Sequence, residues 1–152
     1  MRTSLTIVCT VLAAIAPLVA AQSIDATARG DARVTDTQQL VLQGALDGSS
    51  RGTLHVTLRW DGSPQAAGHW RVSFENQGAD GTVVETGSLR GTITGGSIVP
   101  GPAEAGTALS NLTLTIQEGT GDHATVAAGS GRMDVRLGRE GEPFTASLAL
   151  TF

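Results

Sequence analysis

The chain contains no lysine and no tyrosine, and Cys9 is its one cysteine. All ten basic residues are therefore arginines, and aromatic residues make up only 3% of the sequence. Cys9 lies inside an N-terminal apolar run that we expect to be removed. Its loss would exclude disulfides, cysteine-based metal sites and cysteine nucleophiles from the mature protein.

Residues 1–21 have the pattern of a secretory signal peptide. Arg2 supplies a positive charge, residues 5–19 are mostly apolar, and Val19-Ala20-Ala21 is a small-residue cleavage site. A membrane-spanning helix needs about 20 apolar residues, whereas this run is shorter and contains Pro17. We therefore predict cleavage and a secreted or periplasmic protein of about 130 residues, enough for one domain without disulfides.

The charged residues are scattered singly along the chain. Asp and Glu together number 14 against ten arginines, which gives a formal net charge of −4. Nucleic-acid-binding proteins concentrate basic side chains in a patch or stripe, and no such stripe occurs here. We expect no nucleic acid partner and no insertion into a membrane.

The most regular stretch is residues 52–76, which we interpret as a β-hairpin. Apolar residues alternate with polar ones in both arms, 52–60 and 69–76, and a loop of residues 61–68 joins them. A period of two residues places one apolar and one polar row on opposite faces of each strand. Both tryptophans fall on the apolar row, so we expect this hairpin to be the densest part of the core.

Alternation recurs along the rest of the chain, separated by turns rich in Gly, Asp and Pro. Together with the two hairpin arms it predicts about eight strands, the others being within residues 32–46, 82–94, 107–117, 123–128, 132–137 and 144–152. Short connections favour an all-β, antiparallel up-and-down meander that forms a closed or nearly closed small barrel. A two-sheet β-sandwich is the alternative. We expect residues 22–31 to be a disordered lead-in to a single β domain over residues 32–152.

Polar side chains of the hairpin are the main candidates for chemistry. If Trp60 lies opposite Trp70, His55 faces Glu75 across the strands; a register shifted by two residues would instead place Asp61 opposite Arg71. We expect a solvated outer face, because an acid/base site would require these residues and His69 to line a cleft. No HExxH, GxSxG, P-loop or Rossmann sequence occurs.

A second candidate is the turn that contains Glu118, Asp122 and His123. Zinc prefers histidine ligands and calcium prefers oxygen ligands, but no second histidine is suitably spaced. We expect a polar turn there, no metal and no cofactor, and a protein that is not an enzyme.

The last strand ends in an apolar row that runs from Phe144 through Ala146, Leu148 and Leu150 to Phe152. This resembles the terminal strand of bacterial outer-membrane β-barrels. Those barrels also carry aromatic girdles and strands of about 9–11 residues, whereas this sequence has no tyrosine, two tryptophans and several predicted strands that are shorter. An outer-membrane barrel is therefore the less favoured alternative, and the architecture is closer to soluble lipocalin-like barrels.

Two functional hypotheses follow. The first is an exported non-enzymatic barrel that binds a small apolar ligand in its interior, since eight strands leave room for side chains or for one small molecule. The second is a protein-interaction module that uses loops 61–68 and 95–106, because loops on a rigid sheet often carry function. The residues expected to line the interior are Leu54, Val56, Leu58, Trp60, Trp70, Val72, Phe74, Leu114 and Leu148.

Overall fold

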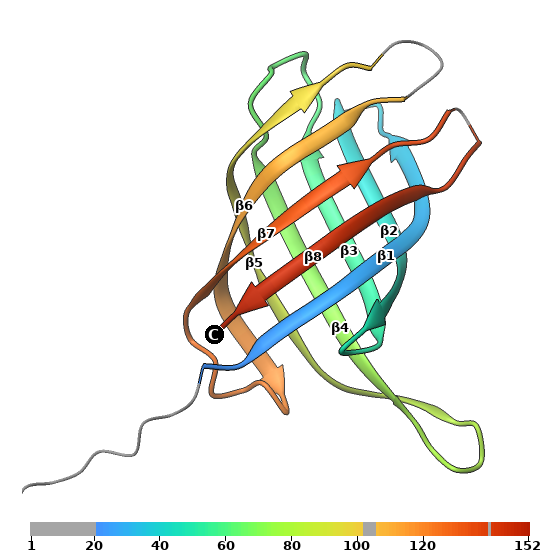
Figure 1. The fold of residues 1–152 in the computed structure, drawn as a ribbon, viewed down its shortest axis with the longest axis vertical. Helices are drawn as coiled ribbons and strands as arrows, with labels where there is room; N and C mark the ends of the chain where they lie inside the picture. The colour runs from blue at the N-terminus through green and yellow to red at the C-terminus, as the bar shows by residue number, and fades with distance from the viewer. Residues whose placement is uncertain (1–20, 102–105, 140) are drawn as a thin grey trace, which may run out of the picture.

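The computed structural model describes residues 21–101, 106–139 and 141–152, which form eight strands and no helix. Each strand is antiparallel to the next, and the first also pairs with the last, so the sheet closes into a barrel (Figure 1). The predicted meander barrel is confirmed, and the sandwich alternative is not adopted. The strands are β1 (Ser23–Val34), β2 (Gln39–Gly48), β3 (Gly52–Arg59), β4 (Gly68–Gln77), β5 (Val83–Val99), β6 (Ala108–Gly121), β7 (Gly129–Arg136) and β8 (Phe144–Thr151).

The predicted signal peptide stays a prediction, because residues 1–20 lie outside the described residues. Where the described chain begins, the predicted disordered lead-in over residues 22–31 is wrong. These residues belong to β1, which pairs with β2 on one side and with β8 on the other. The inward side chains of β1 include only Ile24, Ala26 and Ala28. Two of these three are alanines, so the apolar alternation was too weak to recognise.

The strand predicted within residues 32–46 is β2, which begins at Gln39, and residues 32–34 instead end β1. The chain turns between Val34 and Gln39, where the Gln38 N–H donates to the Thr35 carbonyl at 3.1 Å and the Thr35 N–H donates to the Gln39 carbonyl at 2.8 Å. Gln38 has a positive φ of 54°, the left-handed conformation that a tight turn often requires.

Residues 123–128 form a series of turns instead of the predicted strand. The N–H groups of His123, Ala124 and Val126 each donate to the carbonyl three residues earlier. The predicted number of strands was right because this surplus strand offset the missed β1. The next strand, β7, begins at Gly129, three residues before the predicted start at residue 132.

The central hairpin forms, but both registers considered from the sequence are wrong. Trp70 lies opposite Val56, and His55 lies opposite Arg71. The strand β3 ends at Arg59, whose N–H donates to the Ala67 carbonyl at 2.9 Å, while the Trp60 N–H donates to the Gln38 carbonyl at 2.7 Å. Trp60 therefore continues the sequence alternation but hydrogen-bonds to the β1–β2 turn instead of to β4.

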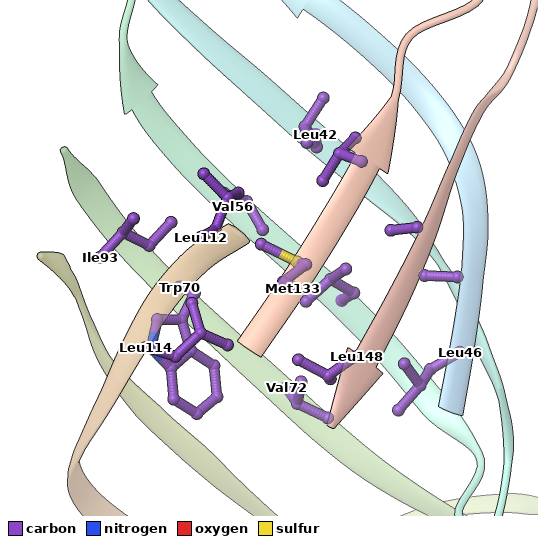
Figure 2. Close-up of a cluster of buried hydrophobic side chains, with 14 of the residues drawn as sticks. Leu42, Leu46, Val56, Trp70, Val72, Ile93, Leu112, Leu114, Met133 and Leu148 are labelled. Atoms are coloured by element: carbon purple, nitrogen blue, oxygen red, sulfur yellow. The ribbon is translucent and has the colours of Figure 1, made fainter. Parts of the chain in front are cut away.

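The barrel interior is filled by the inward rows of all eight strands. These side chains form one connected apolar cluster, part of which is shown in Figure 2. A small eight-stranded barrel is just wide enough for its own side chains, and the described residues follow this arrangement. The largest fully buried members are Trp70, Phe144, Leu40, Leu42, Leu54, Leu58, Leu89, Leu109, Leu112, Leu114, Met133 and Leu150.

The β5 strand is irregular beside two of its glycines. The β4–β5 register shifts beside Gly87, and the β5–β6 register shifts beside Gly91. A Cβ atom on Gly91 would overlap the Thr115 carbonyl oxygen and approach the Trp70 Nε1 atom to 3.1 Å. Because Gly91 has no side chain, the Trp70 indole N–H can donate to Thr115 O at 3.3 Å.

Candidate functional site

Eight of the nine residues predicted to line a ligand cavity are packed in the core. Their exposed fractions lie between 0 and 4%, and they contact one another and the rest of the apolar cluster (Figure 2). The ninth, Trp60, is half-buried and packs against the cluster from outside. Trp60 is therefore the predicted residue that a molecule arriving from solvent can touch.

Trp60 lies at the end of the barrel where β1, β3 and β5 end and β2, β4 and β6 begin, the upper end in Figure 1. We call this end the mouth. The loop that follows Trp60, predicted over residues 61–68, folds against the barrel. The Ala66 N–H donates to the Gly96 carbonyl at 3.1 Å, and the Ile98 N–H donates to the Pro64 carbonyl at 2.8 Å.

These bonds attach the loop to the end of β5, and Gln65 and Ser97 form an isolated β-bridge between them. Ala66 is only 3% exposed as a result. The two loop regions proposed from the sequence as an interaction surface, 61–68 and 95–106, are thus brought together where the structure describes them. Residues 102–105 lie outside the described residues.

A hollow of about 350 Å³ opens where the two loops meet. Apolar side chains dominate its wall, because two prolines and an isoleucine surround one face of Trp60. Ser63 and Thr107 add hydroxyl groups at the rim. The hollow is lined by Trp60, Gly62, Ser63, Pro64, Ile98, Pro100 and Thr107.

A second hollow of about 240 Å³ adjoins Trp60 from the β1, β2 and β7 side. Val34, Leu40 and Leu137 supply its apolar wall, and charged residues of the β1 end and of the β7–β8 turn complete it. Trp60 is common to both hollows. Nearby, Val34 and Val99 leave 57% and 50% of their surface exposed, so the mouth is more apolar than the outer face of the sheet.

The opposite end of the barrel is closed by aromatic contacts. The His123 ring lies 4.4 Å from the Phe74 ring and 5.6 Å from the Phe152 ring, measured between centroids. Burial lowers the pKa of His123 below its ordinary value, an effect that the neighbouring Asp122 carboxylate partly opposes. The sequence favoured a polar turn here over a metal site. In the structure the His123 ring packs against Phe74 and Phe152, and we call these three residues the aromatic plug.

The polar row of the central hairpin faces outward. His55 and His69 are exposed, and Arg71, not Glu75, lies opposite His55. Glu75 instead accepts a 3.5 Å hydrogen bond from the Thr53 hydroxyl. The pairing of histidine with carboxylate that an acid/base site would need is therefore not formed by these residues.

A broader hollow of about 660 Å³ runs over β8 on the outer face. Small side chains such as Thr145 and Ser147 form its floor. Its aspartates already have partners, since Asp47 contacts Arg51 at 3.5 Å and Asp134 accepts the Asn111 N–H at 2.7 Å. It is a shallow valley in which arginines and aspartates balance.

Within the described part of the chain, no group of three or more His, Cys, Asp or Glu side chains is placed to hold a metal ion. Nor do residues 21–101, 106–139 and 141–152 contain a helix long and apolar enough to cross a membrane. The chain matches no protein family model, and neither a curated protein nor a solved structure matches it.

Proposed function

We propose that this protein is an exported, non-enzymatic β-barrel that binds a small apolar molecule at its mouth, against Trp60. One observation carries the proposal. Of the residues predicted to meet a ligand, Trp60 alone is more than 4% exposed, and it lines two hollows at the mouth that both have apolar side chains in their walls. The binding site is accordingly placed at the end of the barrel and not in its interior.

The size and chemistry of the larger hollow support this proposal. Ligand sites are concave, mostly apolar and about 300–1,000 Å³ in volume, and this hollow has about 350 Å³. An indole offers a large, rigid apolar surface with one polar group, which makes it a favourable contact for a planar ligand. At about 0.3 kcal/mol per heavy atom, a ligand of about 17 heavy atoms would bind with a Kd near 0.2 mM.

The outer face of the sheet favours a barrel surrounded by water. Lipid-facing strands present apolar residues outward, whereas here the outward positions carry Arg29, Arg71, Arg90, Arg132 and Asp134. This supports the soluble architecture over the outer-membrane alternative. Export rests on the N-terminal sequence pattern of residues 1–21.

The proposal can be tested with N-phenyl-1-naphthylamine, an uncharged probe of about 17 heavy atoms whose fluorescence rises in apolar surroundings. We expect saturable binding to the purified protein with a Kd between about 10 µM and 1 mM. Trp60→Ala should weaken binding at least tenfold. Val84→Ala is the matched control, because Val84 is an exposed apolar residue at the opposite end of the barrel.

Two outcomes would contradict the mouth site. If Trp60→Ala binds the probe as tightly as the unchanged protein, the ligand lies elsewhere, including the barrel interior. If Val84→Ala weakens binding equally, the probe reports general apolar surface. Circular dichroism of each variant verifies that the barrel is intact.

The alternative from the sequence, a protein-interaction surface, uses the same two loops. The half-exposed Val99 favours it, since this residue lines neither hollow and extends the apolar area of the mouth beyond them. A protein partner would lose affinity on Val99→Asp while small-probe binding persists. A small-ligand site would instead lose affinity on Trp60→Ala and keep it on Val99→Asp, because Val99 is not part of the hollow around Trp60.

A further inference from the structure

Two arginines lie directly opposite each other on the outer face of the barrel. Arg71 of β4 is the cross-strand partner of Arg90 of β5, and His55 of β3 lies opposite Arg71 on the other side. Side chains in this relation have Cβ atoms about 4.5–5.5 Å apart, and like charges so placed are destabilising. Such an arrangement calls for a negative group between or beside the two guanidinium groups.

Glutamates supply part of that negative charge. Arg90 Nε donates to Glu118 Oε2 at 2.6 Å, and the Arg90 NH2 group contacts the same oxygen. Arg71 NH2 donates to Glu85 Oε1 at 3.4 Å. A guanidinium group has five N–H donors, so both arginines retain donors. The side chains of both ion pairs are about half exposed. Exposed ion pairs contribute little free energy, so another anion can compete with the glutamates for the arginines.

The arginines border a hollow of about 510 Å³. Its depth comes from an irregularity in β6. Arg90 lies opposite Glu118 and Gly91 lies opposite Ile116, so Gln117 has no partner and the ladder is interrupted. Gly91 adds no side chain at this point, and the edge of the Trp70 ring forms part of the floor. The hollow is lined by His55, Thr57, His69, Trp70, Arg71, Arg90, Gly91, Gln117 and Glu118.

We propose that this hollow is a binding site for a small oxyanion, or for the phosphate, sulfate or carboxylate group of a larger ligand. The planar forks of Arg71 and Arg90 would hold the anion from two adjacent strands, since guanidinium groups match the geometry of such oxygens. Imidazoles of His55 and His69 and the Thr57 hydroxyl offer further hydrogen bonds at the rim. This site is separate from the mouth and does not depend on the function proposed there.

The test is a titration of the full mature chain with inorganic phosphate, sulfate and acetate, each balanced with sodium chloride at constant ionic strength. The side-chain Nε–H resonances of Arg71 and Arg90 are followed by NMR. We expect saturable shifts of both with phosphate. Sulfate distinguishes a preference for tetrahedral oxyanions from one for phosphate, and acetate reports whether a carboxylate suffices.

Arg71→Gln and Arg90→Gln should each weaken phosphate binding by about tenfold or more, because each removes the charge-assisted hydrogen bonds of one guanidinium group. Arg59→Gln is the matched control. Arg59 is another exposed arginine with a carboxylate partner, 3.1 Å from Asp61, and it lies outside the hollow. The phosphate affinity of the Arg59→Gln variant should stay within twofold of that of the unchanged protein. Arg90→Lys keeps the charge without the fork and should give an intermediate loss.

The proposal is overturned if phosphate, sulfate and acetate all shift these resonances no more than chloride does. It is also overturned if Arg59→Gln weakens binding as much as Arg90→Gln, since the effect would then be general charge. All four substitutions are at exposed positions, and circular dichroism confirms that each variant is folded before its affinity is interpreted.

Discussion

The two ends of the barrel use their few aromatic side chains in opposite ways. At the closed end, the His123 ring contacts both Phe74 and Phe152. At the mouth, Trp60 has a hollow on each side. The strands and the core are continuous between the ends, so the difference arises in the connections. The turns after β6 fold back over the barrel, whereas the connections at the mouth leave an indole partly uncovered.

This difference indicates where a ligand can bind to a barrel whose interior is filled by its own side chains. A packed core contributes stability but offers no space, since interiors approach the density of organic crystals. Space remains only where the inward rows end and loops take over. Both ends have exposed valines, but only at the mouth is a half-buried indole bordered by hollows. At the closed end, aromatic rings cover the core.

The largest loss of stability should come from removing a side chain of the aromatic plug at the closed end. Phe74 is buried at the closed end, and Phe74→Ala is expected to reduce the free energy of unfolding by about 3–5 kcal/mol. Trp60→Ala removes a larger but half-exposed side chain and should cost only about 1–2 kcal/mol. Urea unfolding followed by far-UV circular dichroism measures both. Equal costs would show that the mouth is as much a part of the core as the plug.

An intermediate effect is expected from one glycine at each end. In Gly119→Ala the new Cβ would overlap the backbone carbonyl oxygen of His123, so the turn must move, at a cost of about 1–3 kcal/mol. Gly62 at the mouth has nothing within 4 Å of such an atom but has a φ of 85°. Gly62→Ala should therefore cost only the strain of a left-handed alanine, about 1 kcal/mol. Thermal unfolding of the two variants compares them directly; a costlier Gly62→Ala would contradict the loose packing of the mouth.

The smallest effect should be a pH dependence confined to the closed end. The pKa of His123 is lowered in the folded protein by burial, so the unfolded chain binds a proton more readily. The stability from the neutral ring is complete above the ordinary histidine pKa of about 6.5 and is lost as pH falls through the lowered folded value. Urea midpoints should therefore decrease between pH 7.5 and pH 5.5.

His123→Gln should remove this part of the pH dependence. His69→Gln, at an exposed position on the outer face, should retain it and serves as the control. Identical pH profiles for the unchanged protein and His123→Gln would show that the imidazole is not desolvated by Phe74 and Phe152.

The barrel architecture could be predicted from the sequence because apolar and polar residues alternate in most strands. Leu54, Val56 and Leu58, for example, alternate with polar residues and are all fully buried. It was insufficient for β1, where alanines carry the pattern. It also failed for the hairpin register, because Trp60 extends the alternation although the β3–β4 ladder ends at Arg59.

The candidate sites were predicted less well, for a physical reason. Trp60 was recognised as apolar, but its position between two hollows depends on hydrogen bonds between residues about 30 apart, such as Ile98 N–H to Pro64 O. The pairing of Arg71 with Arg90 depends on the β4–β5 register, which shifts between Phe74 and Glu75. Local sequence patterns do not specify such long-range alignment.

The seam of the barrel joins the two ends of the described chain. Seven of the eight ladders link strands that are neighbours in sequence, but the eighth places Ser23 beside Thr151. Contacts between residues so far apart in sequence form slowly, and this ladder cannot form until β8 has been synthesised. Until then β1 and β7 would both present open hydrogen-bonding edges, which are prone to aggregation. A chain that lacks β8 should therefore aggregate instead of forming the barrel. Pairing of β8 with β1 and β7 is the step that closes the sheet.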